Sequence, residues 1–367
     1  MKICVLCKVV DNFGDIGVVW RLCRQLKTVD ASLEINLVVD DLQSFNKICS
    51  EVRTNVQNQT VDEIEVWDWK ADAVCHEAFS KADGERLSVI LECFQCGRPE
   101  WMEKILFEEK LQRTVHIVMI DYLTAEQYAE DFHCLKSLTR SSKVQKVNFM
   151  PGFTGKTGGL IIDEQWKNLQ SRNADGDILV FTYERDWTGL AQALAEAGLK
   201  VKVARGRGFD SFVESCERIE NSGNERVKLE KLEYLNQDEW DKMMMDCSLL
   251  FIRGEESMSR ACLSGIPFVW HAYPQSDEYQ MVKVNALLER MKRHFKQEDF
   301  SIVRDAWLAF NRPQGEVSDG LLKSACLKFI NARDRLEYGF KDFALDLRKN
   351  GDLANNLVTF IRKLTII

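Results

Sequence analysis

The stretch Ser248-Leu-Leu-Phe-Ile-Arg-Gly-Glu-Glu-Ser257 decides the fold of this chain of 367 residues. Its first five residues form a mainly apolar run, which is typical of a strand buried in a parallel sheet. Residues 253–257 would then lie at the carboxyl edge of that sheet and begin a helix. Free backbone N–H groups at the N-terminus of a helix suit a diphosphate, so the stretch predicts an anion site in an α/β domain.

Apolar runs of strand length alternate with helical stretches in both halves of the chain, and this alternation predicts parallel α/β folds. In the first half, the expected strands cover residues 3–10, 35–39, 64–69, 87–91 and 115–120. In the second half, they cover residues 178–183, 199–204, 227–232, 248–252 and 268–271. The Gly-rich passage 151–159 separates the two series. Because one core rarely serves so long a chain, we expect two domains.

The net charge of −8 and the pI near 5.4 argue against nucleic acid as a partner, which would require a concentrated basic face. No stretch approaches the ~20 apolar residues that span a bilayer, and the N-terminus lacks the layout of a signal peptide. We therefore expect a cytoplasmic protein with no membrane partner. The twelve cysteines are interpreted as free, mostly buried thiols, because their close pairs lack the spacing of a zinc ribbon.

A second cluster of polar residues follows the first expected strand, in Val10-Asp-Asn-Phe-Gly-Asp-Ile-Gly17. Acidic groups at a turn between strand and helix are desolvated and need a partner, so Asp11 and Asp15 are expected to face a cleft. The glycines at positions 14 and 17 do not match the Gly-x-Gly-x-x-Gly pattern of dinucleotide binding. A purely structural alternative makes Asp15 the N-cap of the helix.

Four motifs occur in order over most of the chain. They are Asn12-Phe-Gly-Asp-Ile-Gly17, Pro151-Gly-Phe-Thr-Gly155, Arg253-Gly-Glu-Glu-Ser257 and Pro267-Phe-Val-Trp-His-Ala-Tyr-Pro-Gln275. Together they closely resemble the motifs of the EarP family of protein-arginine rhamnosyltransferases. The resemblance implies a GT-B glycosyltransferase fold, an α/β architecture in which two Rossmann-like domains face each other across a cleft. It also implies inverting transfer of L-rhamnose from dTDP-β-L-rhamnose to an arginine of translation elongation factor P.

The resemblance further implies how the chain is divided between the two domains. Residues 1–155 would form the acceptor-binding domain, and residues 156–349 the domain that binds the dTDP-sugar. A C-terminal helix at about residues 350–367 is expected to pack back on the first domain.

Carried over residue by residue, the resemblance implies three catalytic carboxylates, which are Asp15, Asp11 and Glu255. It implies a donor pocket formed by Phe181, Tyr183, Gln237, Phe251, Arg253, Gly254, Glu256, Ser257 and Tyr273. On the acceptor side it implies Asn12, Phe13, Gly14 and Gly17. Glu256 stands where the family often has aspartate, so its carboxylate is one methylene further from the backbone. No metal ion or other cofactor is implied.

The chemistry requires such groups independently of the resemblance. An arginine nucleophile holds its proton with a pKa above about 12, beyond the reach of an ordinary histidine base. A carboxylate such as Asp15, held in a dry cleft, could orient the guanidinium and accept its proton as the C–N bond forms. Backbone N–H groups with Arg253 and Ser257 would stabilise the charge on the leaving dTDP, so no metal is needed.

Other interpretations remain open at this point. A different GT-B enzyme, such as a small-molecule glycosyltransferase or a sugar-nucleotide epimerase, would share the fold and the nucleotide loop. A non-catalytic module that senses a nucleotide and holds a translation factor would share the site without the transfer. In a structural alternative, Glu255 and Arg253 form only an ion pair that caps a helix. Residues 205–208, Arg-Gly-Arg-Gly, are interpreted as a solvated turn.

Overall fold

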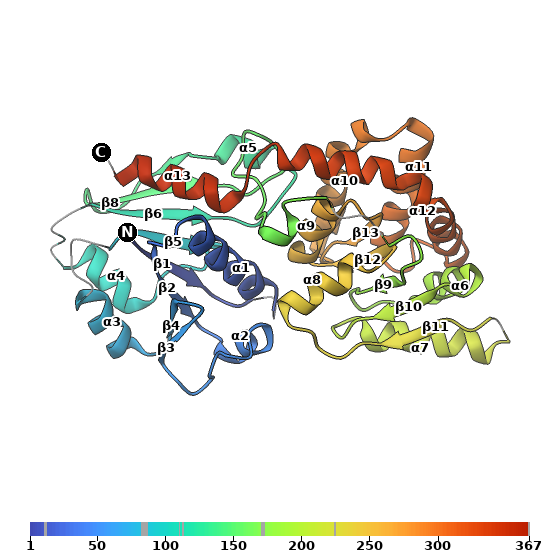
Figure 1. The fold of residues 1–367 in the computed structure, drawn as a ribbon, viewed down its shortest axis with the longest axis horizontal. Helices are drawn as coiled ribbons and strands as arrows, with labels where there is room; N and C mark the ends of the chain where they lie inside the picture. The colour runs from blue at the N-terminus through green and yellow to red at the C-terminus, as the bar shows by residue number, and fades with distance from the viewer. Residues whose placement is uncertain are drawn as a thin grey trace. The chain divides into compact units, whose positions relative to one another are not determined.

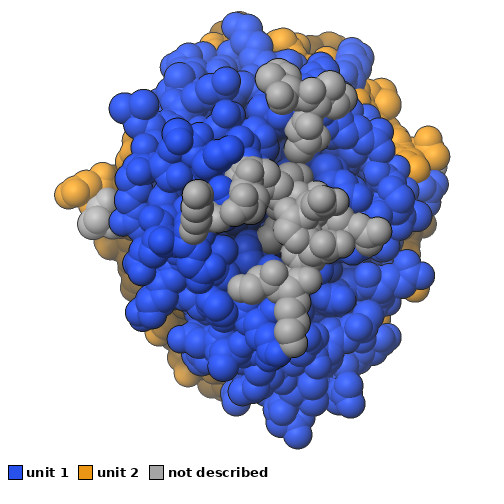
Figure 2. All heavy atoms as spheres, turned by 90° about the vertical axis from the view of Figure 1, so that its left-hand side faces the viewer, with its two compact units in different colours: residues 1–165, 349–367 blue, residues 166–348 orange. Residues whose placement is uncertain are grey.

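The computed structural model describes residues 1–10, 13–81, 87–109, 111, 114–169, 173–223 and 225–365 (Figure 1). The chain divides into two compact units. Unit 1 consists of Met1–Gln165 and Lys349–Ile367, and unit 2 consists of Trp166–Arg348 (Figure 2, blue and orange). The chain therefore passes from one unit to the other after residues 165 and 348. Residues 156–165, which follow the boundary drawn from the sequence, belong to unit 1.

Unit 1 is built on a mainly parallel sheet with the strand order β3-β4-β2-β1-β5-β6-β8-β7. Its strands are β1 (Lys2–Cys7), β2 (Glu34–Val39), β3 (Asn58–Val61), β4 (Ile64–Asp68), β5 (Leu87–Cys93), β6 (Val115–Ile120), β7 (Lys136–Ser137) and β8 (Val144–Phe149). The edge strands β3 and β7 run antiparallel to their neighbours. All five strands predicted for this half of the chain are confirmed.

The strands differ from the prediction in two respects, and both have a physical reason. β1 is shorter than predicted because the next N–H groups leave the ladder: Val9 donates to Asp40 and Val10 to Asp15, each at 2.8 Å. The hairpin of β3 and β4 was not predicted. Its turn residues, Asp62 and Glu63, have φ values of 47° and 60°, a conformation that normally selects glycine or asparagine.

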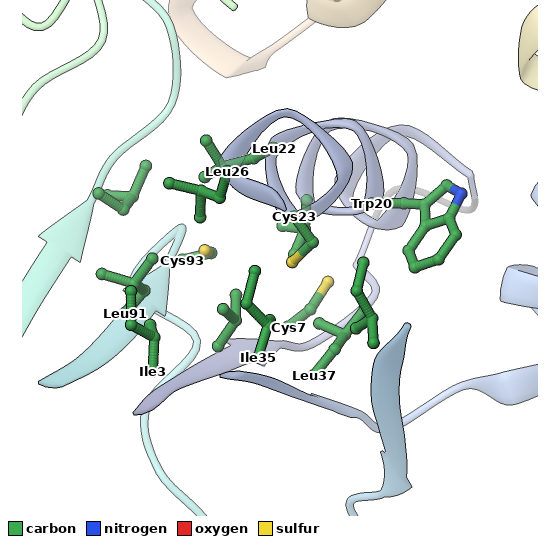
Figure 3. Packing of buried hydrophobic residues seen from close by; sticks show 14 of the residues in the cluster. Ile3, Cys7, Trp20, Leu22, Cys23, Leu26, Ile35, Leu37, Leu91 and Cys93 are labelled. Atoms are coloured by element: carbon green, nitrogen blue, oxygen red, sulfur yellow. The ribbon is translucent and has the colours of Figure 1, made fainter. Parts of the chain in front are cut away.

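The helices of unit 1 are α1 (Gly14–Val29), α2 (Leu42–Ile48), α3 (Asp72–Lys81), α4 (Glu100–Phe107), α5 (Tyr128–Phe132) and α13 (Leu353–Thr365). Trp20, Cys23 and Leu26 of α1 belong to the same buried cluster as Cys7 of β1 and Ile35 of β2 (Figure 3). The last helix completes this cluster with residues from Leu353 to Ile361. The core of unit 1 therefore joins the two ends of the chain.

Unit 2 is built on a parallel sheet with the order β11-β10-β9-β12-β13. Its strands are β9 (Ile178–Val180), β10 (Lys200–Val203), β11 (Lys228–Lys231), β12 (Leu249–Arg253) and β13 (Phe268–His271). Its α-helices are α6 (Thr188–Ala197), α7 (Phe209–Asn221), α8 (Gln237–Met245), α9 (Glu255–Ser264), α10 (Tyr279–Met291), α11 (Gln297–Asn311) and α12 (Asp319–Arg348). Its short 3-10 helices are η2 (Ser276–Glu278) and η3 (Lys292–His294), and a further one, η1 (Glu164–Trp166), covers the point at which the chain passes from unit 1 to unit 2. The five strands predicted for this half are also confirmed.

Each sheet has a point at which the direction of its connections reverses. In unit 2 this switch point lies between β9 and β12, and in unit 1 it lies between β1 and β5. Open parallel sheets bind ligands at the carboxyl ends of the strands that flank such a point. The segments that follow β9, β12, β1 and β5 are therefore the first places to look for a site.

The Gly-rich passage between the two predicted domains is packed within unit 1. The N–H group of Gly158 donates to the carbonyl of Met150, and the amide of Asn356 in α13 donates to the carbonyl of Gly158. A Cβ on Gly158 would lie 2.5 Å from the ring of Phe149, so only glycine fits there. The whole passage, residues 151–159, therefore belongs to unit 1, whose first segment continues to residue 165.

The cysteines and the helices bear on two further expectations. All twelve cysteines are free thiols, and most are buried, as the sequence predicts. Burial, and then the nearby Asp15 carboxylate, raise the pKa of Cys7, which keeps this thiol protonated. Among the described residues, no helix combines the length and the apolar character needed to cross a membrane.

The contribution of α13 to the core of unit 1 can be measured by deletion of one side chain. Leu357 is fully buried in the cluster, whereas Thr359 in the same helix is exposed. We expect Leu357→Ala to lower the free energy of unfolding by about 2–5 kcal/mol and Thr359→Ala to change it by less than about 0.5 kcal/mol. Chemical unfolding followed by tryptophan fluorescence would check this, and equal losses in the two variants would contradict it.

Candidate active site

A buried guanidinium occupies the switch point of unit 2. Arg253, the last residue of β12, places its Cζ atom 4.5 Å from the centre of the Phe181 ring and 4.7 Å from that of Tyr183. Both aromatic residues follow β9, so the two strands that flank the switch point supply the cation and its aromatic walls. The cation is attracted to the negative faces of these rings, which fixes its position.

This guanidinium has no anionic partner among the residues that the structure describes. Arg253 is 9% exposed, and its Nε atom is buried without a hydrogen bond. No carboxylate of the described chain forms an ion pair with it, and the rings of Phe181 and Tyr183 replace only part of the lost hydration. A buried charge without compensation is costly, so the arrangement favours the binding of an anion.

The loop after β10 approaches the same guanidinium closely. A Cβ on Gly206 would lie 2.8 Å from Cε2 of Phe181 and 3.2 Å from Nη2 of Arg253. A Cβ on Gly208 would lie 2.5 Å from the carbonyl oxygen of Thr182. The interpretation of residues 205–208 as a solvated turn is therefore wrong for the two glycines, because both pack against the segment that follows β9. The spacing of the two glycines was the only signal of this close approach.

The first turn of α9 lies directly after Arg253, as the sequence predicts. Gly254 adopts a φ of 76° at the N-cap, a conformation that glycine tolerates best, and it has no side chain with which to cap the helix. The first bond within the helix runs from the N–H group of Met258 to the carbonyl of Gly254. This end of the helix therefore presents backbone N–H groups and a partial positive charge beside Arg253.

The acidic residues of this turn have cations of their own. The carboxylate of Glu255 lies 3.4 Å from Nζ of Lys283 in α10, and that of Glu256 lies 3.9 Å from Nε of Arg260. Arg253 is not paired with Glu255, so the alternative in which these two residues form a structural ion pair is not what the structure shows. Ser257, the next residue, is buried.

Tyr183 connects the guanidinium to two residues of the β13 segment. Its ring makes edge contacts with His271 and Tyr273, with centroid distances of 5.2 and 5.3 Å. Its N–H group donates to Nδ1 of His271 at 3.1 Å, so the neutral imidazole carries its proton on Nε2. Burial lowers the pKa of His271 well below its ordinary value, and the cations Arg185 and Arg253 lower it further.

Two other residues expected in the donor pocket lie in different surroundings. Gln237 is the buried first residue of α8, on the same helix as Trp240, whose ring meets Phe181 at 4.9 Å. Phe251 is fully buried, and its ring stacks on that of Phe310 in α11 at 5.4 Å. The structure thus places Phe251 in the core behind the site. It also adds Trp240, for which the sequence carried no signal.

The switch point of unit 1 contains a buried carboxylate. Asp15 lies in the first turn of α1 and is 3% exposed. Its Oδ2 atom accepts from the N–H group of Val10 at 2.8 Å, and its Oδ1 atom accepts from the hydroxyl of Tyr122 at 3.1 Å. Asp15 is not the N-cap of α1, because Phe13 holds that position. The structural alternative for Asp15 is therefore wrong.

Phe13, Gly14 and Gly17 of the acceptor-side motif lie in or directly before the first turn of α1, which also contains Asp15. Gly14 is the first residue of α1, and the N–H group of Gly17 donates to the carbonyl of Phe13 at 2.9 Å. Asp11 and Asn12 lie outside the described residues. The sequence interpretation missed Tyr122, which follows β6 and donates to Asp15.

Comparison with solved structures defines the class of the fold. A structure from work on the structural basis for EarP-mediated arginine glycosylation of translation elongation factor EF-P matches with a TM-score of 0.59 and 19% identity, over 99% of each chain. A UDP-glucose: anthocyanidin 3-O-glucosyltransferase in complex with UDP matches with a TM-score of 0.53 and 9% identity, over 100% of this chain and 99% of the other. The chain therefore has the GT-B glycosyltransferase fold that was predicted.

Comparison of sequences then identifies the family. The profile of the family described as Elongation-Factor P (EF-P) rhamnosyltransferase EarP matches residues 3–362, and the chain belongs to this family. A protein-arginine rhamnosyltransferase of Shewanella oneidensis is 26% identical, over 98% of this chain and 97% of its own length. Another, from Pseudomonas aeruginosa, is 29% identical, over 85% of this chain and 87% of its own length. Membership confirms the resemblance that the four motifs indicated.

The lowered pKa of His271 makes the stability of unit 2 depend on pH. Below the ordinary value of 6.5, the unfolded chain binds a proton that the folded protein excludes, so the free energy of unfolding falls as the pH falls. We expect this group to contribute a loss of up to about 1.4 kcal/mol per pH unit below that value.

The measurement is chemical unfolding at pH 7.5 and 5.5 in the wild type and in His271→Asn, whose amide oxygen preserves an acceptor near Nδ1. The variant should be less stable at both values, because it leaves a cavity among aromatic rings, but it should lose less stability between them. If the variant and the wild type lost the same free energy of unfolding between pH 7.5 and 5.5, the pH dependence could not be assigned to His271.

Proposed function

We propose that the protein transfers L-rhamnose from dTDP-β-L-rhamnose to an arginine side chain of translation elongation factor P, with inversion at the anomeric carbon. We propose further that it acts in the cytoplasm and needs neither a metal ion nor another cofactor. Membership of the EarP family supports the type of reaction and the acceptor. The observation that carries the proposal is the buried guanidinium of Arg253, which lacks a carboxylate in the described chain and suits a nucleoside diphosphate.

On the donor side, the proposal assigns the diphosphate to Arg253 and to the N–H groups of the first turn of α9. Charge develops on the leaving dTDP as the sugar becomes cationic, and fixed donors in a dry site stabilise that charge. Tyr183 and Tyr273 form an aromatic surface beside the guanidinium and are suited to contact the sugar or the base. Glu255, paired with Lys283, would contact the donor or the acceptor.

On the acceptor side, the proposal assigns the guanidinium of the target arginine to Asp15. A buried carboxylate with fixed hydrogen bonds forms a strong, oriented pair with a guanidinium. As the nitrogen attacks the anomeric carbon, the C–O bond to dTDP breaks, and the proton of the nitrogen passes to the carboxylate. Asp11 would assist at the same edge of the sheet.

The role of Arg253 predicts opposite effects on binding and on stability. We expect Arg253→Met to weaken the binding of dTDP by about 10- to 100-fold, because charge-assisted hydrogen bonds to the diphosphate are lost. The free protein should be unchanged or more stable, since the variant removes a buried charge that has no carboxylate partner among the described residues.

Calorimetric titration with dTDP and thermal unfolding without it would measure the two effects. Arg226→Met serves as a matched control, because Arg226 is an exposed residue of the same unit, and it should leave both quantities unchanged. Loss of stability without loss of dTDP binding would show that Arg253 is structural.

Transfer itself is tested by intact-mass analysis of elongation factor P after incubation with the protein and dTDP-L-rhamnose. We expect a gain of one deoxyhexose on an arginine, no gain with Asp15→Asn, and an undiminished gain in the presence of EDTA. The Asp15→Asn protein should still bind dTDP, because Asp15 lies in unit 1 and the proposed diphosphate site lies in unit 2. Absence of any gain with the wild type, although dTDP binds, would refute the acceptor and keep the donor site.

A further inference from the structure

We propose that Tyr122 is a positioning residue for the transfer: its hydroxyl, held in place by the ring of Phe94, orients the carboxylate of Asp15 toward the acceptor. The inference rests on the proposed role of Asp15 as the group that binds the guanidinium and accepts its proton. It concerns a residue outside the four motifs, on the segment that follows β6.

The two oxygens of Asp15 are held from two different strands. Oδ2 accepts from the backbone of Val10, which continues from β1, and Oδ1 accepts from Tyr122, which follows β6. Hydrogen bonds restrict the rotation of a carboxylate about its last side-chain bond. The bonds to both oxygens fix the plane of the Asp15 carboxylate. Of these two bonds, only the one from Tyr122 can be removed by mutation, because the other comes from a backbone N–H group.

Tyr122 is itself fixed by a stacked ring. The rings of Tyr122 and Phe94 lie 4.4 Å apart at an angle of 13°. Phe94 follows β5, the second strand of the switch point, and its N–H group donates to the carbonyl of Ile120 at 2.7 Å. The segments after β5 and β6 are also joined by a bond from Nε2 of Gln95 to Asp121 at 3.2 Å.

The backbone beneath this stacked pair adopts a costly conformation. Phe94 and Gln95 have φ values of 56° and 53°, in the left-handed region that neither residue type favours. Such a conformation costs of order 1–3 kcal/mol at each residue and is retained where the surrounding structure requires it. Here it accompanies the stacking of the Phe94 ring on Tyr122, whose hydroxyl donates to Asp15.

The chemical role of Tyr122 is limited to orientation. In the transfer, the C–N bond forms, the C–O bond to dTDP breaks with its electron pair on the phosphate, and one proton moves from nitrogen to Asp15. Tyr122 keeps its own proton throughout and donates the same hydrogen bond before and after the step. Its loss should therefore slow the chemical step and leave donor binding unchanged.

The test compares Tyr122→Phe with wild type in steady-state transfer to elongation factor P and in titration with dTDP. We expect kcat to fall about tenfold, while the Kd of dTDP stays within about twofold, because a misplaced group affects the step but not the donor site. Phe94→Leu keeps the hydroxyl but removes the stacked ring, and it should cause a smaller loss of kcat. Tyr128→Phe, which removes a hydroxyl from α5 of the same unit, should behave as wild type.

The outcomes separate this inference from the proposed function. If Asp15→Asn abolishes transfer while Tyr122→Phe retains the wild-type kcat, the inference is overturned and the proposed function stands. If Asp15→Asn transfers normally, the role of Asp15 fails, and with it the role of Tyr122 in the reaction.

A second measurement reports on the contact without any transfer. We compare the chemical unfolding midpoints of Tyr122→Phe, Asp15→Asn and the double variant. If the hydroxyl holds the carboxylate, the double variant should shift the midpoint by less than the sum of the single shifts. Shifts that add would overturn the inference even if no acceptor were ever modified.

Discussion

The buried guanidinium of Arg253 is the constraint on which the site in unit 2 depends. It is delivered by a strand whose residues are all buried, and among the described residues its neighbours are aromatic rings rather than paired carboxylates. Its neighbours fit that charge: His271 stays neutral, the adjoining loop has a glycine at its closest approach, and Glu255 and Glu256 face other cations. The buried charge therefore destabilises the free protein, and a bound anion relieves this destabilisation. The relief strengthens the binding of an anionic donor.

The two units use the same position in the fold for groups of opposite charge. At the switch point of unit 2, a cation and the N-terminus of α9 suit a diphosphate. At the switch point of unit 1, the carboxylate of Asp15 at the start of α1 suits a guanidinium. In both cases the charged group is held by residues that directly follow parallel strands, so its position is determined largely by the sheet.

The sequence predicted most of the fold because buried parallel strands are continuous apolar runs. It did not predict the β3 and β4 hairpin, whose turn is formed by Asp62 and Glu63 without the glycine that such a turn favours. For the site, local motifs located Arg253, Gly254 and Asp15 because each follows directly after a strand. Tyr122 and Trp240 were missed, since nothing near them in sequence shows that they contact Asp15 and Phe181. Phe251 was placed in the donor pocket because it lies beside a motif. The motif does not show which way its ring points, and the ring packs on Phe310.

The place of α13 in the core of unit 1 has a consequence for biosynthesis. Unit 2 is an insertion, whose residues 166–348 all leave the ribosome before the helix that completes unit 1. Synthesis proceeds at about 5–20 residues per second, and domains generally fold as units while it continues. The inserted unit therefore has its whole sequence before unit 1 has its own. Unit 1 is thus translated first but finishes folding last. Until α13 has been synthesised, the buried cluster of unit 1 lacks the residues that this helix contributes.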